Sequence, residues 1–264
     1  MQTNKILEVK SLCFEINGNK LIKDISFGVE NGDMLSVVGP NGSGKSTLVK
    51  LISGELLPSS GFIFFDRKCI SKYNPSDLAL KRSVLSQSNN LSFPFSVIDI
   101  VKMGRFTQKD KRFIHNDEAI CGELLKIFDL QDYINRNYMT LSGGEKQRVQ
   151  LARVIAQIWS LDSYNKKLLI LDEPTSYLDI KHQASLFDFL KVINKKGLTI
   201  ILVLHDLNLA VRNSNKILML KNSKLVKYGY TNDVLKLDTL KSVFDVDLDV
   251  FKTGSNNKPL IVFK

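Results

Sequence analysis

The chain alternates between short apolar segments and polar segments, in a pattern typical of strands and helices that follow one another. Three segments are apolar almost throughout, which predicts parallel strands buried on both faces: Met34–Val38, Leu168–Leu171 and Leu198–Leu204. Three more segments predict further strands: Leu7–Phe14, Asp24–Glu30 and Ser60–Asp66. The whole pattern predicts an α/β fold.

The middle of the chain has a different pattern. Apolar residues return at helical spacing between Asp117 and Phe128, and a second helix is expected from Glu145 to about Trp159. We therefore predict a single domain over residues 1–264, with a core at residues 1–87 and 145–264 and an inserted helical subdomain at residues 88–144.

A glycine-rich loop follows the first buried strand and precedes a predicted helix that runs through Ile52. Glycines let the backbone turn tightly and bring N–H groups onto phosphates, and the dipole of the next helix favours negative charge. Lys45 adds a point charge, and Ser46 offers a hydroxyl group to Mg²⁺. The loop matches the phosphate-binding pattern over Gly39, Pro40, Asn41, Gly42, Ser43, Gly44, Lys45, Ser46 and Thr47.

Polar residues end the other two buried strands, at the edge where ligands bind in an open α/β sheet. Asp172 is suited to the Mg²⁺ shell as a hard oxygen ligand, and Glu173 is suited to polarising an attacking water. His205 follows the strand Leu198–Leu204, and we expect it to contact the γ-phosphate.

With these motifs in order, the chain resembles the ATPase subunit of an ABC transporter over nearly its whole length. The resemblance implies a P-loop NTPase fold, with a RecA-like core, an antiparallel β subdomain and an inserted α-helical subdomain. By position, Gln87 corresponds to the Q-loop, Asp179 to the D-loop and His205 to the switch histidine. The signature motif falls on Leu141, Ser142, Gly143, Gly144 and Glu145.

The resemblance also implies the ligands. ATP and Mg²⁺ are the expected cofactors, with Ser46, Gln87 and Asp172 on the metal and Lys45, Gln87, Glu173 and His205 as the catalytic group. Phe14 is the candidate for stacking on adenine. The alternative is that Phe14 is an ordinary core residue of its strand, in which case Ile16 faces the base.

Quaternary structure follows from the same resemblance, because the signature motif of one subunit closes on ATP held by the P-loop of the other. One P-loop and one signature per chain therefore predict a homodimer. No segment reaches the run of about 18 apolar residues that spans a bilayer, and no signal peptide is evident. We expect a peripheral protein on the cytoplasmic face of the inner membrane, attached to a separate permease and working indirectly with a solute-binding protein.

The net charge and the cysteines do not change this functional prediction. The net charge of +10 comes from lysines and arginines spread along the chain, which is typical of solvated surface. Attraction to an anionic membrane face is the alternative, and no groove-reading motif indicates nucleic acid. The cysteines Cys13, Cys69 and Cys121 form no Cys-x-x-Cys pair and are read as buried thiols.

The finer resemblance is to importers of iron chelates, haem and cobalamin, through residues 97–105, and within them to the haem-import ATPases. The latter likeness rests on residues 91–97, on residues 152–159 with the extra loop 160–167, and on residues 178–183. Phe106-Thr107 departs from the usual Pro-His pair. Haem itself is not expected to touch this subunit.

Several alternatives stay open. A ferric-siderophore or cobalamin importer would use the same chemistry, and motif chemistry alone does not separate importers from exporters. A soluble cassette ATPase acting on nucleic acid usually has two cassettes or a coiled-coil insertion, and this sequence has neither. The apolar segment at residues 89–101 is read either as the permease groove or as core of the helical subdomain.

Overall fold

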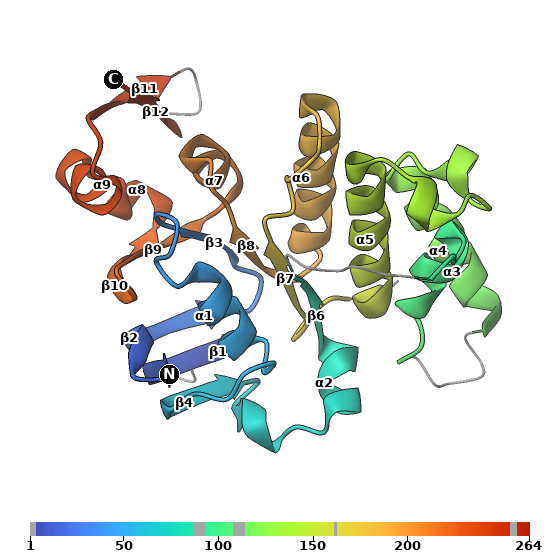
Figure 1. Cartoon of the computed structure of the whole chain (residues 1–264), viewed down its shortest axis with the longest axis horizontal. Helices are drawn as coiled ribbons and strands as arrows, with labels where there is room; N and C mark the ends of the chain where they lie inside the picture. Colours follow the sequence, from blue (N-terminus) through green and yellow to red (C-terminus); the bar gives the residue numbers. More distant parts are fainter. Residues whose placement is uncertain (1–3, 87–92, 108–113, 161–162, 254–257) are drawn as a thin grey trace. The chain divides into compact units, whose positions relative to one another are not determined.

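The computed structural model describes residues 4–86, 93–107, 114–160, 163–253 and 258–264 (Figure 1). The chain divides into two compact units, one formed by residues 1–73 and 199–264 and the other by residues 74–198. The finer predicted division into a core and a helical subdomain at residues 88–144 stays a prediction. None of the described helices is both long and apolar enough to cross a lipid bilayer.

The first unit contains a four-stranded antiparallel sheet. Its strands lie in the order β2 (Asn19–Glu30), β1 (Lys5–Ile16), β4 (Ser60–Phe65) and β5 (Lys68–Cys69). Asn17 and Gly18 both have positive φ, so β1 and β2 are joined by the two-residue turn that matches the natural twist of a hairpin. The predicted strands of this region are confirmed, and β2 begins five residues earlier than Asp24 because the turn pairs Ile16 with Asn19.

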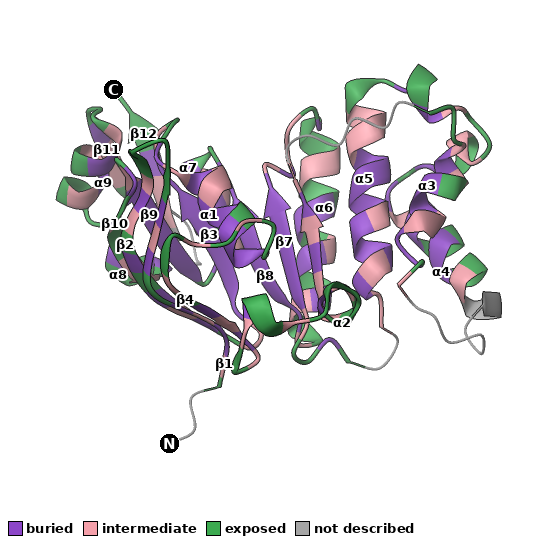
Figure 2. Cartoon of the chain, turned by 60° about the horizontal axis from the view of Figure 1, so that its bottom comes forward, coloured by how far each residue is buried: buried purple, intermediate pink, exposed green. Residues whose placement is uncertain are grey.

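A second set of strands in this unit leads into the glycine-rich loop and into His205. Strands β10 (Lys224–Tyr230), β9 (Lys216–Lys221), β3 (Met34–Val38) and β8 (Thr199–Val203) lie side by side in that order. β3 is parallel to both β8 and β9 and, like β8, is buried along its full length (Figure 2). The carboxyl ends of β3 and β8 therefore meet at one edge. The helices of this unit are α1 (Lys45–Ile52), η1 (Ile70–Lys72), α7 (Leu207–Asn213), α8 (Thr231–Val234) and α9 (Leu237–Phe244).

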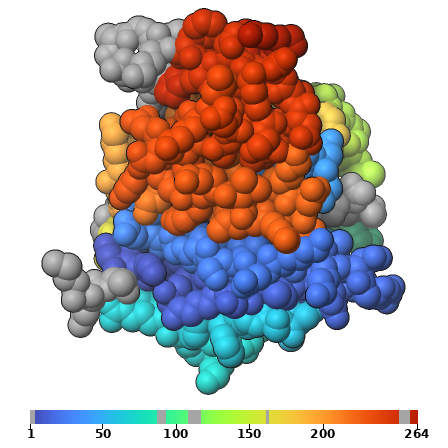
Figure 3. Space-filling model, turned by 90° about the vertical axis from the view of Figure 1, so that its left-hand side faces the viewer, coloured from blue at the N-terminus to red at the C-terminus, as the bar shows by residue number. Residues whose placement is uncertain are grey.

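N-terminal and C-terminal parts of the chain pack together in this unit. The ring of Tyr228 on β10 packs on Phe27 of β2, with centroids 5.9 Å apart, and its hydroxyl donates to the carbonyl of Gly28. Figure 3 shows the orange segment directly against the blue N-terminal strands, with the red C-terminal residues beyond it. A final hairpin, β11 (Leu248–Thr253) and β12 (Lys258–Phe263), is fastened to α7, because the Asn208 amide donates to and accepts from the backbone of Ile261 at 2.9 and 2.8 Å.

The second unit is largely helical. Strands β6 (Arg82–Leu85) and β7 (Leu168–Asp172) pair in parallel. Arg148 of the buried helix α5 donates to the carbonyl of Phe128 at 2.8 Å, which satisfies a free carbonyl at the end of α4. The helices are α2 (Pro75–Lys81), α3 (Val97–Met103), α4 (Ile114–Ile127), η3 (Gln131–Tyr133), η4 (Tyr138–Thr140), α5 (Gly143–Ile158) and α6 (Ile180–Lys195). The helices predicted at residues 117–128 and 145–159 are confirmed.

Candidate functional site

The glycine-rich loop joins β3 to α1, as predicted. A Cβ atom at Gly39 would lie 2.2 Å from the carbonyl oxygen of Leu220, and one at Gly44 would lie 2.8 Å from that of Leu21. Both residues also have positive φ, at 153° and 101°. Glycine is therefore required at both positions, by the backbone angle and by the close approach of neighbouring strands.

The functional groups of the loop point to anion binding. The ammonium group of Lys45 is buried and donates to the carbonyl oxygens of Gly39 at 2.8 Å and Pro40 at 3.0 Å. The hydroxyl of Ser43 is buried with no hydrogen bond to any described residue. Helix α1 begins at Lys45 and has no acidic residue in its first turn. A buried cation, an unsatisfied hydroxyl and the N–H groups that any helix leaves without an intrahelical acceptor at its start together favour an anionic ligand.

His205 lies at the same edge as this loop. The backbone N–H of Leu204 donates to the carbonyl of Val37 at 3.2 Å, so the chain enters His205 beside the residues that enter the loop. His205 is exposed, and the next residue, Asp206, caps α7 by accepting from the N–H groups of Asn208 at 2.7 Å and Leu209 at 3.1 Å. The capping role of Asp206 was not predicted, although an Asp before an apolar helix is its usual signal.

Asp172 and Glu173 end β7 in the second unit. Asp172 is 4% exposed, whereas Glu173 is half-buried and has a left-handed backbone with φ of 52°. A non-glycine residue persists in that conformation only when its neighbours hold it. The Gln147 amide donates to the carbonyls of Glu173 at 3.5 Å and Pro174 at 3.2 Å, and the Ser176 hydroxyl donates to the Glu173 carboxylate at 3.4 Å. Ser176 begins the segment that resembles the D-loop, but its contact with Glu173 was not predicted, and Gln147 was missed altogether because neither contact follows from a motif.

The signature residues form the start of α5. Ser142 is the N-cap: its Oγ accepts from the N–H of Glu145 at 3.3 Å, and the Glu145 carboxylate accepts from the N–H of Ser142 at 2.7 Å. The pKa of Glu145 is lowered, most of all by the bond that its carboxylate accepts from the backbone N–H of Ser142. A Cβ at Gly144 would lie 2.7 Å from the carbonyl of Tyr177. The signature helix therefore packs closely against the segment that leads to Asp179, within one unit.

Phe14 is 8% exposed and faces the core of its sheet, whereas Ile16 at the end of the same strand is 48% exposed. This burial favours the alternative in which Ile16 is the residue available to a base, and the stacking role of Phe14 stays a prediction. Gln87 lies outside the described residues.

Comparison with known proteins agrees with this geometry. The model of the family described as ABC transporter matches residues 22–176. A hemin import ATP-binding protein, HmuV, of Rhodopseudomonas palustris strain BisB5 is 40% identical over 97% of this chain and 96% of its own length. The HmuV protein of Escherichia coli O157:H7 is 35% identical over 97% of this chain and 99% of its own length.

Solved structures agree as well. A protein assigned to the metal-chelate type ABC transporters, in an inward-facing conformation, superposes with a TM-score of 0.79 at 29% identity, covering 99% of this chain and 97% of that one. The ATP-binding cassette MJ0796, in a dimeric post-hydrolysis state with ADP and phosphate, gives a TM-score of 0.75 at 25% identity, covering 85% of this chain and 98% of that one. These matches confirm the predicted P-loop NTPase fold. The chain therefore belongs to the ABC transporter family, as one of its ATP-hydrolysing subunits.

Proposed function

We propose that this chain is the ATPase of an importer for haem, working with a separate membrane permease and, indirectly, a solute-binding protein. The observation that carries the proposal is the 40% identity, over 97% of the chain, to a hemin import ATP-binding protein. The likeness to a metal-chelate type transporter supports the same class. An importer of a ferric siderophore or cobalamin is the second candidate, since both solutes are also metal chelates.

Phosphate binding is assigned to the loop from Gly39 to Thr47. The Lys45 ammonium now donates to two loop carbonyls, and it can exchange them for phosphate oxygens, with which it makes stronger, charge-assisted bonds. The Ser43 hydroxyl would gain the hydrogen bond that it lacks among the described residues. The N–H groups at the start of α1 complete the set of donors.

The residues also fit a magnesium ion by their donor chemistry. The proposed ligands are Ser46, which follows Lys45 in the first turn of α1, Asp172 at the end of β7, and Gln87. Hydroxyl, carboxylate and amide oxygens are the hard ligands that Mg²⁺ prefers. When bound, Mg²⁺ would neutralise the charge that develops on the phosphates.

Hydrolysis itself is assigned to Glu173 and His205. Glu173 would orient and deprotonate the attacking water, for which a half-buried carboxylate held at a fixed backbone angle is suited. The Ser176 hydroxyl, 3.4 Å from that carboxylate, would restrain its rotamer. His205 would donate a hydrogen bond to the γ-phosphate and so sense whether ATP is present.

A homodimer is the proposed working form. The chain has one P-loop and one signature motif, and the related cassette MJ0796 was solved as a dimer. In the proposed dimer, Leu141, Ser142, Gly143, Gly144 and Glu145 of one chain act on ATP held by the partner, with Asp179 near the twofold axis. The Ser142 hydroxyl accepts from the N–H of Glu145 and also bonds to the Glu145 carboxylate, and in the dimer it would donate its proton to a phosphate of the partner's ATP instead.

Growth on haem tests the solute. A strain that lacks this chain should grow on inorganic iron but poorly on haem as sole iron source. The wild-type chain should restore growth on haem, and the Glu173→Gln form should not. Unimpaired growth on haem, in a strain without a second haem system, would transfer the assignment to a siderophore or cobalamin. In vesicles containing the co-purified permease, ATP hydrolysis stimulated by haem and not by cobalamin would give the same answer biochemically.

A further inference from the structure

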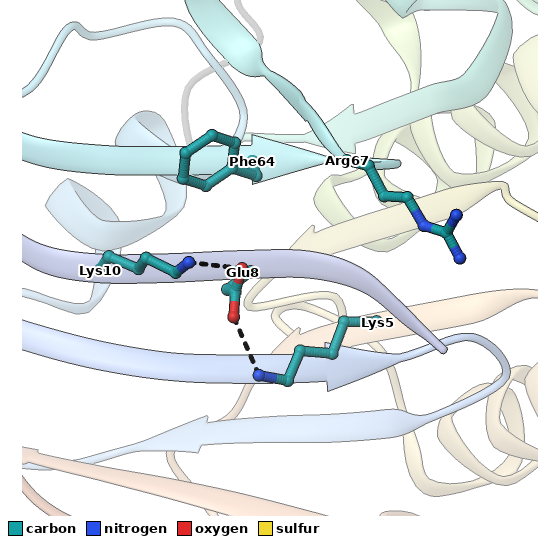
Figure 4. Close-up of a pocket in the computed structure, with 5 residues that line it drawn as sticks. All are labelled: Lys5, Glu8, Lys10, Phe64 and Arg67. Carbon is teal, nitrogen blue, oxygen red and sulfur yellow. Dashed lines mark hydrogen bonds and ion pairs between the residues drawn. The ribbon is translucent and has the colours of Figure 1, made fainter. Parts of the chain in front are cut away.

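A pocket of about 220 Å³ opens on the outward face of the antiparallel sheet, and none of its residues has a role in the nucleotide chemistry. It is lined by Lys5, Glu8 and Lys10 of β1, by Phe64 of β4 and by Arg67 in the turn that follows β4 (Figure 4). Strand alternation places Glu8 and Lys10 on this face, opposite the buried Leu7 and Val9, and a register shift between Lys5 and Leu7 brings Lys5 to the same face. The lining carries three cations and one carboxylate.

Glu8 fixes two of the cations. Its Oε1 accepts from the Lys5 ammonium at 2.9 Å and its Oε2 from the Lys10 ammonium at 3.1 Å, so the lysines approach one carboxylate from opposite sides (Figure 4). Both bonds lower the pKa of Glu8, and the bond from Lys5 contributes most. Each ammonium group has three N–H donors and gives one to Glu8. Donors therefore remain on both sides of a fixed carboxylate.

A glycine makes this arrangement possible. Gly28 is paired with Glu8 across β1 and β2, and a Cβ atom there would lie 2.9 Å from Cδ and Cε of Lys5. The Lys5 side chain thus lies across the bare backbone of Gly28 before reaching Glu8. On the other side, the Lys10 ammonium lies 5.3 Å from the centre of the Phe64 ring, close enough for a cation–π attraction.

Arg67 is the third cation, and no residue that the structure describes forms an ion pair or a hydrogen bond with it. Asp66 and Arg67 both have positive φ, at 43° and 66°, and they form the two-residue turn between Phe65 and the paired Lys68. The turn fixes the backbone of Arg67 at the rim of the pocket, where its guanidinium presents five N–H donors.

We propose that this pocket binds a phosphate dianion, either free inorganic phosphate or the terminal phosphate of a phosphomonoester. Three cations and one carboxylate leave a formal charge of +2, which matches a phosphate dianion. The volume is below the range of about 300–1,000 Å³ that suits a drug-sized ligand, so a small anion fits better than a whole nucleotide. Arg67 provides the planar pair of donors that phosphate accepts, and the lysines provide point charges.

The test measures phosphate binding to the full chain by equilibrium dialysis, with Mg²⁺ and a saturating non-hydrolysable ATP analogue present so that the P-loop and the γ-phosphate position are already occupied. One further phosphate per chain is expected to bind at low ionic strength. The double variant Lys10→Gln/Arg67→Gln should weaken this binding by about tenfold or more, because it removes two charge-assisted donors. Lys20→Gln, which removes a charge from β2 outside the pocket, is the matched control and should bind as the wild type does.

Two results would overturn the proposal: absence of phosphate binding when the ATP analogue fills the nucleotide site, or equal binding by the wild type and the double variant. Thermal melting of each variant checks that the fold is intact. Vesicles separate the two sources of phosphate. Retention on phosphatidic acid vesicles, but not on phosphatidylcholine vesicles, that is lost in the double variant and kept in Lys20→Gln would identify a lipid headgroup. Equal retention of the wild type and the double variant on phosphatidic acid vesicles would exclude the lipid headgroup as the source of the phosphate.

Discussion

One carboxylate oxygen of Asp179, Oδ1, accepts two hydrogen bonds from His182, one from its backbone N–H at 2.8 Å and one from its ring Nδ1 at 2.8 Å. A carboxylate can only accept, so the ring must carry its proton on Nδ1. The bonds lower the pKa of Asp179, the backbone bond contributing most. The proposed D-loop residue is thus also the N-cap of α6.

This pair predicts a pH-dependent contribution to stability. A carboxyl group whose folded-state pKa is lowered stabilises the fold above its unfolded pKa of about 3.9, and that contribution is lost as pH falls through the lower folded value. Asp179→Ala should therefore lower the Tm at pH 7, and the difference from wild type should shrink below about pH 4. Asp179→Asn keeps a capping oxygen without the charge and should show a smaller difference. A Tm difference that stays constant down to pH 3 would contradict this assignment.

Replacing Glu173 by Gln should abolish steady-state ATP hydrolysis while ATP binding persists. The substitution removes the proposed general base and leaves the loop from Gly39 to Thr47 intact, and loss of a general base typically costs about 10²–10⁴-fold in rate. Phosphate release under saturating ATP measures the effect. Ser176→Ala is the control, since it removes a neighbour of the carboxylate but not the base, and it should retain most activity. Near-normal turnover in Glu173→Gln would show that another group is the base.

The backbone at Glu173 gives an independent prediction about stability. Its φ of 52° lies in the left-handed region, where residues with a Cβ are disfavoured by about 1–2 kcal/mol. Glu173→Gly should therefore be more stable than Glu173→Ala, the reverse of the usual order for these residues. Urea unfolding of the two variants, neither of which hydrolyses ATP, makes the comparison without interference from activity. If the alanine form is equally stable or more so, the left-handed conformation is wrong.

Close packing around the loop predicts unequal effects of two similar substitutions. Gly39→Ala would drive a Cβ to 2.2 Å from the carbonyl oxygen of Leu220 and should cost about 3 kcal/mol. Gly42→Ala meets nothing within 4 Å and should cost about 1–2 kcal/mol, from its positive φ alone. Chemical unfolding without nucleotide measures both. Equal costs would mean that Leu220 does not approach the loop as described.

Substitutions of Lys45 and Ser142 should impair different steps, ATP binding and ATP hydrolysis respectively. Lys45→Ala removes a charged donor worth about 1.5–3 kcal/mol, so ATP binding should weaken by about 10–150-fold. Ser142→Ala should leave ATP binding to dilute monomer unchanged and abolish hydrolysis, because its hydroxyl is proposed to act on the partner's nucleotide. ATP titration at low protein concentration decides between these outcomes, and equal weakening by both variants would count against the composite site of the dimer.

Local patterns predicted the parts of the fold that depend on local physics. The buried strands β3, β7 and β8 agree with their apolar runs to within one residue or so, because a strand covered on both faces needs apolar side chains throughout. The helix expected from Glu145 begins at Gly143 instead, because the capping box of Ser142 and Glu145 draws both glycines into its first turn.

The sequence patterns could not predict contacts between residues that are far apart along the chain. The approach of Leu220 to Gly39, the burial of Phe14 and the packing of Tyr177 on the signature glycines each join residues that are distant along the chain. The left-handed turn at Glu173 was also missed, because Glu carries no preference for that conformation and its neighbours impose it. The motifs thus predicted which residues matter but not the contacts that hold them.

The two hydrogen bonds between Asn208 and Ile261 couple the C-terminal hairpin to the helix that follows His205, the residue proposed to contact the γ-phosphate. Asn208 belongs to the first turn of α7, three residues after His205, and both of its amide atoms are bonded to the backbone of the C-terminal hairpin. A fused tag or a docked protein that displaces this hairpin would therefore also displace α7, which begins two residues after His205. A load or a bound protein on strand β12 is therefore expected to change the rate of ATP hydrolysis through the position of His205.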